Sequence, residues 1–139
     1  MNPSMLFQFA NSYVVIGWFL LLVVPNWKYT MTIVKTGIIF LFAILYTYLI
    51  SKGITNFDPK SFSSIEKVRV LFQDDNALTA GWIHYLAFDL FVGATIVEHA
   101  KQAGISRWIV SVALPFTFMF GPIGYLIYKT VKLVKIGLK

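Results

Sequence analysis

Cysteine is absent from this chain of 139 residues, and charged side chains are scarce. Without cysteine the chain can form no disulfide, no thiolate nucleophile and no cysteine-ligated metal site. Charged residues make up 13% of the chain and hydrophobic residues 58%, whereas soluble domains average roughly 25% and 45–50%. The chain is therefore too apolar for an ordinary soluble domain, and its length allows one domain at most. We expect a single membrane domain over residues 1–139.

Acidic residues are also few: six, against twelve basic ones, which gives a net charge of +6. In a chain this apolar, the excess is typical of lysines that lie beside a membrane and face anionic headgroups. We therefore expect the lipid bilayer, and no nucleic acid, as a partner. The two histidines, His84 and His99, would lie about 22 Å apart on one helix and cannot share a metal ion. Phosphate-binding and serine-hydrolase motifs are also absent, and no metal site is expected.

Four apolar runs have close to the 20 residues with which a helix crosses about 30 Å of hydrocarbon. They predict an all-α integral membrane protein with four transmembrane helices. The second run is short unless Thr30–Val34 joins it, and the first is expected to be a retained span because no basic segment precedes it. The predicted spans are 5–25, 35–51, 77–97 and 108–128, followed by a basic tail at 129–139.

A polar segment separates the second predicted span from the third. Within it, Ser63 and Glu66 form a capping-box pattern, which predicts a short amphipathic interfacial helix over 63–73 on the membrane surface. Asp74, Asp75 and Asn76 are candidate caps for the start of the third span, and Gly104 is expected to end it. With four crossings, both termini and this segment share one side, which holds eight basic residues against four. The positive-inside rule then predicts that both termini are cytoplasmic.

The third span carries His84 and Asp89 near its middle. A charge at the bilayer centre costs about 2.5–3.5 kcal/mol even on the gentler scales. The two side chains point about 140° apart around a helix, so they do not form an intrahelical pair. Each face therefore needs its own cover. A seam of small residues at Ala80, Ala87 and Ala94 suits close helix packing, and self-association into a homo-oligomer is one way to cover the second face.

Polar residues of other spans fall near the depth of His84. We expect a polar layer of Asn11, Thr47, His84 and a loosened turn near Phe118, where Pro122 cannot donate a hydrogen bond. His84 and Asp89 are the candidate catalytic residues, and a purely structural hydrogen-bonding role is the alternative for both. Candidate ligand-binding residues are Asn11, Thr47, Trp82, Tyr85, Phe88 and Tyr125.

Four segments of the chain share a pattern with one known family. They read FDPKSFSS at 57–64, GWIHYLAFDLFVG at 81–93, GISRW at 104–108 and FGPIGY at 120–125. On these motifs the chain resembles the abscisic-acid-deficient-four family, small membrane proteins that plants require for neoxanthin formation and that have bacterial relatives. The resemblance covers about half of the chain, from 57 to 128, and the first span matches only in being apolar.

The resemblance implies carotenoid metabolism. Neoxanthin formation opens an epoxide while a neighbouring proton is lost to give an allene, which requires one acid and one base in a dry, elongated cavity. His84 and Asp89 are the motif residues for these roles, and either would act with a group such as Tyr46 or Tyr125. The lack of a plastid-type leader points to a bacterial inner membrane.

The function expected from the sequence is thus that of a carotenoid- or isoprenoid-related membrane protein. Isomerase activity on a xanthophyll and binding of a carotenoid without catalysis are both left open. The cofactor is also left open, with a bound carotenoid as one possibility and no metal expected. One alternative is a non-enzymatic subunit that packs in a homo-oligomer or a larger membrane complex. Another is a proton-coupled carrier that uses Asp89.

Overall fold

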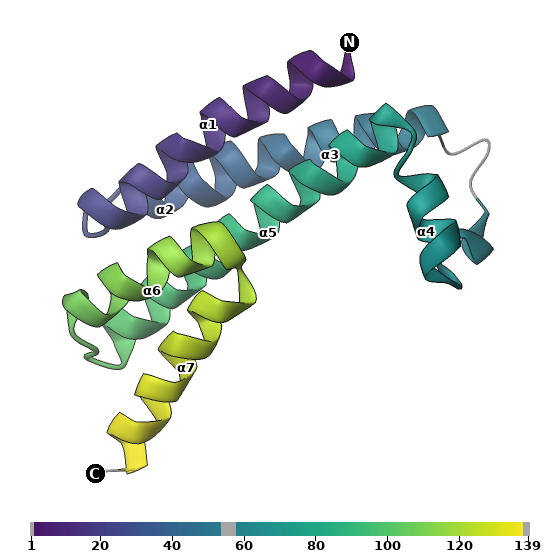
Figure 1. Cartoon of the computed structure of the whole chain (residues 1–139). Coiled ribbons are helices and arrows are strands. Elements are labelled where there is room, and N and C mark those ends of the chain that lie inside the picture. The colour runs from purple at the N-terminus through teal and green to yellow at the C-terminus, as the bar shows by residue number, and fades with distance from the viewer. Residues whose placement is uncertain (1, 54–57, 138–139) are drawn as a thin grey trace.

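The computed structural model of the chain describes residues 2–53 and 58–137, and it is helical throughout with short connections (Figure 1). The sequence begins with the long helix α1 and continues with a second, composite helix. The elements in chain order are α1 (Pro3–Val23), α2 (Thr30–Thr32), the π-helix η1 (Ile33–Ile39), α3 (Phe40–Gly53), the 3₁₀ helix η3 (Pro59–Phe62), α4 (Ile65–Leu71), α5 (Asp75–Gln102), α6 (Arg107–Phe120) and α7 (Pro122–Gly137).

Three helical stretches in the described chain are long and apolar enough to cross a membrane: α1, the composite helix Thr30–Lys52, and α5. In the composite helix, α2, η1 and α3 follow one another directly, so Thr30–Val34 joins the second span. Helix α1 begins two residues before the predicted first span and ends two residues before its predicted end, and the other two stretches extend beyond the predicted bounds at both ends. The prediction of an all-helical protein with membrane-spanning helices is confirmed to this extent.

Helix α5 is the centre of the bundle and packs along α1, α3 and α6. The alanine seam predicted from the sequence is used inside the chain, because Ala80, Ala87 and Ala94 are all buried. On another face of α5, a side chain at Gly93 would lie 2.7 Å from the Trp18 ring of α1. The absent side chain lets the indole pack flat against the helix. The chain thus covers more than one face of α5 by itself.

The predicted fourth span is not a continuous helix. It breaks at Gly121, whose φ of +44° lies in the region that favours glycine, and α7 begins directly afterwards with Pro122 at its first position. Helix α6 has 14 residues, which is about 21 Å and too short to cross the hydrocarbon core. The structure therefore does not confirm a single crossing over 108–128.

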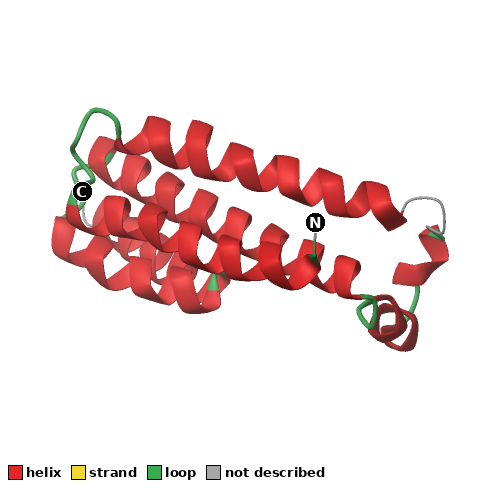
Figure 2. Ribbon diagram, turned by 90° about the horizontal axis from the view of Figure 1, so that it is seen from above, coloured by secondary structure: helices red, strands yellow, loops and turns green. Residues whose placement is uncertain are grey.

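Helices α6 and α7 instead form a hairpin that is tight at its turn, and α7 then runs back at an angle to α6 (Figure 1). A side chain at Gly124 would lie 2.3 Å from the Thr117 amide nitrogen and 2.5 Å from the Ala113 carbonyl oxygen, so the two backbones touch there. The Lys135 ammonium donates to the Gly104 carbonyl in the turn between α5 and α6. The far end of α7 therefore returns to the end of the bundle where α6 begins, and Figure 2 shows the N- and C-termini well apart along the bundle.

Local signals at the helix ends explain the remaining boundaries. The Asp74 carboxylate accepts a hydrogen bond from the Ala77 amide (2.9 Å) and begins α5. Gly104, with φ of +60°, ends it, as predicted. The N-cap of α4 is Ser64, one residue beyond the predicted Ser63, because the Ser64 hydroxyl accepts the Lys67 amide at the distance of 3.4 Å. Helix α4 stands away from the bundle (Figure 1). Phe57, quoted in the family pattern, lies outside the described residues.

Candidate functional site

The two intramembrane ionisable residues of α5 face different helices, as their angular separation predicts. His84 lies toward α3, where its ring stands 5.6 Å from the Tyr46 ring. Its second ring neighbour, Phe88, is one turn further along α5, and those ring centroids are 4.5 Å apart in a stacked arrangement. The His84 imidazole makes no hydrogen bond to any described residue, and its ring contacts are those with Tyr46 and Phe88. It is exposed on the surface of the bundle, with its nitrogens available to a ligand.

A cavity of about 470 Å³ lies beside His84, in the groove between the α3 helix and α5. This volume falls within the range of about 300–1,000 Å³ that is typical of ligand pockets. The wall is apolar and strongly aromatic, and its residues with polar side-chain groups are His84 and Tyr46. Its lining residues are Ile39, Phe42, Ala43, Tyr46, Ile83, His84, Ala87, Phe88 and Phe91. We call this cavity the His84 groove.

A charged pair lies beyond one end of the His84 groove on the same helix seam. The Lys35 ammonium donates to the Glu98 carboxylate at 2.6 Å, and both side chains are about one third exposed. The same ammonium stands 5.9 Å from the Phe91 ring, which lines the groove. Lys35 belongs to η1, a π-helix of seven residues, and π-helical turns occur often at functional sites. The groove thus has an ion pair toward one end and His84 with Tyr46 toward the other.

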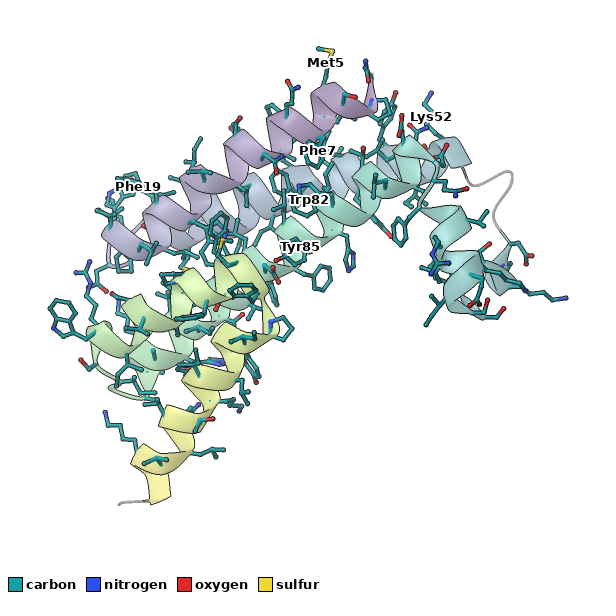
Figure 3. The ribbon with its side chains drawn as sticks, viewed as in Figure 1. Met5, Phe7, Phe19, Lys52, Trp82 and Tyr85 are labelled. Atoms are coloured by element: carbon teal, nitrogen blue, oxygen red, sulfur yellow. The ribbon has the colours of Figure 1, made fainter. Side chains whose placement is uncertain are left out.

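The opposite face of α5 forms a second polar set, with α1 and the hairpin. The Trp82 indole donates to the Asn11 side-chain oxygen of α1 at 2.8 Å, and the Phe7 ring lies 5.5 Å from the Trp82 ring. Figure 3 shows Phe7 and Trp82 in the space between the two helices, with Tyr85 further along α5. The Tyr85 hydroxyl donates to the Met119 carbonyl at 3.0 Å. These bonds satisfy polar groups that lipid could not.

Asp89 lies at the tip of the α6–α7 hairpin. A side chain at Gly121 would lie 2.3 Å from one Asp89 carboxyl oxygen, so only glycine lets the turn approach the carboxyl this closely. Asp89 is 8% exposed, and its Oδ2 has no hydrogen-bond partner in the described chain. Asp89 does not line the His84 groove. Consequently His84 and Asp89 cannot act together on one bound molecule in that groove.

The polar layer expected around His84 is not assembled in the structure. Asn11 bonds Trp82 on another side of α5, and the Thr47 hydroxyl donates to the Ala43 carbonyl of its own helix at 2.8 Å. Neither residue lines the His84 groove. The helix does loosen after Phe118, but the carbonyl that accepts a bond from α5 is that of Met119, and its donor is the Tyr85 hydroxyl, not His84. The layer is replaced by two separate sites.

The remaining predicted ligand-binding residues divide between these surroundings. Phe88 lines the His84 groove. Tyr125 lies on α7, is 40% exposed, and has the Lys129 ammonium 6.0 Å from its ring. A role for these residues, and for Trp82 and Tyr85, in binding stays a prediction. In the described ranges no three histidine, aspartate or glutamate side chains gather as metal ligands.

Sequence reasoning missed the pair Lys35–Glu98, because the two residues lie 63 positions apart on different helices. The signal was present: Lys35 follows Thr30–Val34 inside an apolar run, where an unpaired ammonium is costly. The π-helical geometry of η1 has no comparable signal in the residues. Phe42 and Phe91 were likewise not distinguished from the other phenylalanines, since only the pairing of α3 with α5 places them in one wall.

Comparison with known proteins gives one match. The family model described as ABA4-like, ABA DEFICIENT 4-like, matches residues 5–128, which is most of the chain and includes the first span. Neither the curated proteins nor the solved structures contain a significant match.

Proposed function

We propose a function from one premise, which is that the chain belongs to the ABA DEFICIENT 4-like family. Membership suggests a role related to carotenoids or xanthophylls. The proposal is that the protein binds a carotenoid or a related isoprenoid in the His84 groove. The observation that carries it is the groove itself: an apolar, largely aromatic wall of Phe42, Phe88 and Phe91 beside an imidazole without a hydrogen-bond partner among the described residues.

The chemistry of the groove suits a long apolar molecule with a polar group near one point. Aromatic side chains offer large rigid contact surfaces, and few polar groups fix the orientation of ligands in mostly apolar pockets. Ala43 and Ala87 also line the groove, and their small side chains leave space between the aromatic residues. His84 would accept or donate a hydrogen bond to a hydroxyl or ring oxygen of the ligand. Lys35 and Glu98 stand beyond Phe91, where a second polar group of a longer ligand would lie.

A catalytic form of this proposal assigns the acid and the base within the same groove. In the opening of a xanthophyll epoxide to an allenic alcohol, the Tyr46 hydroxyl would protonate the epoxide oxygen as its C–O bond breaks. The His84 imidazole would take the proton that leaves the neighbouring carbon, and a return of that proton to Tyr46 completes an isomerisation. The support is that both residues line one cavity, with ring centroids 5.6 Å apart. Asp89 has no part in this scheme because it lies at the hairpin.

The test compares pigment binding by variants that fill the groove or an unrelated surface. Ala43→Phe adds a ring to the groove, while Val112→Phe adds one to an exposed position of α6 outside it. After expression in a carotenoid-producing host, the wild type and Val112→Phe should purify with stoichiometric pigment, and Ala43→Phe with little. Absorption spectra and mass analysis of extracts measure this. A colourless, folded wild type would refute the proposal and favour a non-enzymatic subunit.

The catalytic form needs its own variants. Tyr46→Phe and His84→Gln should keep bound pigment, since both preserve most of the apolar surface, and should lose conversion of an epoxide-bearing xanthophyll by at least about a hundredfold, the lower range for general acid–base catalysis. Asp89→Asn is the matched control and should keep the conversion. Loss of conversion only in the Asp89 variant would assign the chemistry to the hairpin instead.

A further inference from the structure

The α6–α7 hairpin has a consequence for how the chain sits in the membrane. We propose that it is a re-entrant hairpin, which enters and leaves the bilayer on one side, and that the basic end of the molecule on that side binds anionic lipid headgroups. The basic end is defined by Lys28, Lys101, Arg107, Lys132 and Lys135. This inference does not depend on any ligand in the His84 groove.

The depth of the hairpin tip is fixed by its contact with α5. Gly121 touches Asp89, which is the fifteenth of the 28 residues in α5. Thirteen residues, or about 20 Å, separate Asp89 from the end of α5, and the 14 residues of α6 span about 21 Å. The two lengths agree, so α6 descends from the α5–α6 turn to about the middle of the bundle. The chain there turns back instead of continuing to the other side.

At Gly121 the turn meets the condition for irregular backbone at membrane depth, which is burial in protein rather than exposure to lipid, whereas the neighbouring Phe120 and Pro122 are exposed. Gly121 is buried, its amide donates to the Thr117 carbonyl at 2.8 Å, and the Met119 carbonyl accepts the Tyr85 hydroxyl. Gly124 then allows α7 to run back against α6 at backbone contact. A continuous crossing would require all of these contacts to be broken.

Three connections meet at the basic end. Arg107 donates to the Leu22 and Val23 carbonyls at the end of α1, at 3.3 Å and 3.0 Å. Lys135 of α7 donates to Gly104 in the α5–α6 turn. The end of α1, the end of α5, the start of α6 and the end of α7 are therefore together. The N-terminal residues lie at the other end, where Pro3 and Ser4 border a pocket with Asp75 at the start of α5.

The charges of the two ends differ sharply. At the N-terminal end and in the 52–75 segment, four basic residues stand against four acidic ones, at Asp58, Glu66, Asp74 and Asp75. The basic end and α7, counted together with the neighbouring pair Lys35–Glu98, hold seven described basic residues against one acidic residue, Glu98. Interfacial lysines and arginines are each worth roughly fivefold in affinity for an anionic leaflet. Charge complementarity therefore selects anionic headgroups as the partner of the basic end.

The same distribution reverses the orientation expected from four crossings. That expectation grouped the tail lysines with the N-terminus, whereas the hairpin places them at the opposite end of the bundle. By the positive-inside rule the basic end is cytoplasmic, and the N-terminus then lies on the other side of the membrane.

Because the natural chain has no cysteine, single-cysteine labelling can test the topology without a background. Ser4→Cys marks the N-terminal end, Lys101→Cys the end of α5, and Lys132→Cys the C-terminal helix. In intact spheroplasts and in inverted vesicles, a membrane-impermeant maleimide should label the last two variants from the same side and Ser4→Cys from the other. Labelling of Lys132→Cys together with Ser4→Cys would establish a fourth crossing and overturn the proposal.

Lipid binding is tested on the full chain with a charge-matched pair of triple variants. One replaces Lys129, Lys132 and Lys135 by glutamine; the other replaces Lys60, Lys67 and Arg69. After reconstitution into an equal mixture of phosphatidylglycerol and phosphatidylcholine, native mass spectrometry would count the phosphatidylglycerol molecules that remain bound to each protein. The wild type and the second variant should retain it preferentially, and the first should lose at least fivefold of that preference. Equal preference in all three, or equal loss in both variants, would overturn the assignment of the basic end.

Discussion

Replacement of Gly124 by alanine should open the α6–α7 hairpin. An added methyl group would lie 2.0 Å from the Thr117 hydroxyl oxygen, 2.3 Å from its amide nitrogen and 2.5 Å from the Ala113 carbonyl oxygen. The hydroxyl can rotate away, but the two backbone atoms are fixed in α6. Helix α7 must therefore move outward by roughly an ångström over its contact with α6. Overpacking of this kind costs about 1–3 kcal/mol and sometimes more.

We expect a loss of stability at the upper end of that range, because the added methyl group meets backbone atoms, which cannot rotate away. A loss of about 3 kcal/mol corresponds to a more than hundredfold change in the opening equilibrium of the hairpin. Gly37 provides the control with the opposite sign: its nearest neighbour would be 3.9 Å from an added methyl group, and it lies within a helix. Gly37→Ala should therefore gain about 0.5–1 kcal/mol from reduced chain entropy.

Hydrogen exchange in detergent micelles measures this opening, because exchange reports local unfolding that global transitions miss. Amides of α7 should exchange about a hundredfold faster in Gly124→Ala than in the wild type, while amides of α1 stay unchanged. In Gly37→Ala, α7 should exchange as in the wild type. If the amides of α7 in Gly124→Ala keep their protection from exchange, the two helices do not touch at this position. The re-entrant hairpin would then lack its main contact between α6 and α7.

Two further predictions concern charges. The backbone amide of Glu66, and after it the Ser64 hydroxyl, lower the pKa of the Glu66 carboxyl group by hydrogen bonding. Because this pKa is depressed in the folded state, the carboxylate stabilises α4 at neutral pH, and this stabilisation is lost as the pH falls through that pKa. Amide exchange in α4 should accordingly rise on acidification, and Glu66→Gln should abolish the change. The second prediction concerns the ion pair of Lys35 and Glu98. A double-mutant cycle of Lys35→Met and Glu98→Gln, measured by unfolding in mixed micelles, should give a coupling energy of up to about 1 kcal/mol, as for other partly exposed pairs. If the effects of the two single variants simply add, the pair contributes nothing to stability.

The helices that sequence reasoning located best are those with strong local signals. The Asp74 cap and Gly104, which ends α5, each rest on one residue whose chemistry decides the boundary. The opposed faces of His84 and Asp89 follow from the 100° step of a helix, and the structure gives them separate partners in Tyr46 and Gly121. These features are local, so no knowledge of the packing was needed to predict them.

The site was predicted less well, because the depth of a residue in the membrane does not determine which neighbouring helix its side chain faces. Asn11 and His84 were placed at one level, and the layer that was expected from this assumed that equal depth brings side chains together. In the structure the Asn11 oxygen accepts the Trp82 indole, and His84 faces α3. Which helix lies on which face of α5 is a tertiary property, and the spacing of residues within one span does not contain it.

The fourth apolar run shows that the length of an apolar segment is not enough to predict a membrane crossing. Residues 108–128 are long and apolar enough for one span, and Pro122 suggested a kink rather than an end. The decisive residues are the glycines on either side of that proline: Gly121 takes a positive φ, and Gly124 lets the returning helix contact α6. Each is also compatible with a kinked span. What favours the return is that the turn meets a buried carboxyl at Asp89 and a donor at Tyr85. The presence of an aspartate inside the membrane is therefore explained at least in part by the hairpin tip that packs against it. Because an unpaired carboxylate is costly in the bilayer, we expect the contact between Asp89 and Gly121 to hold α6 and α7 in place.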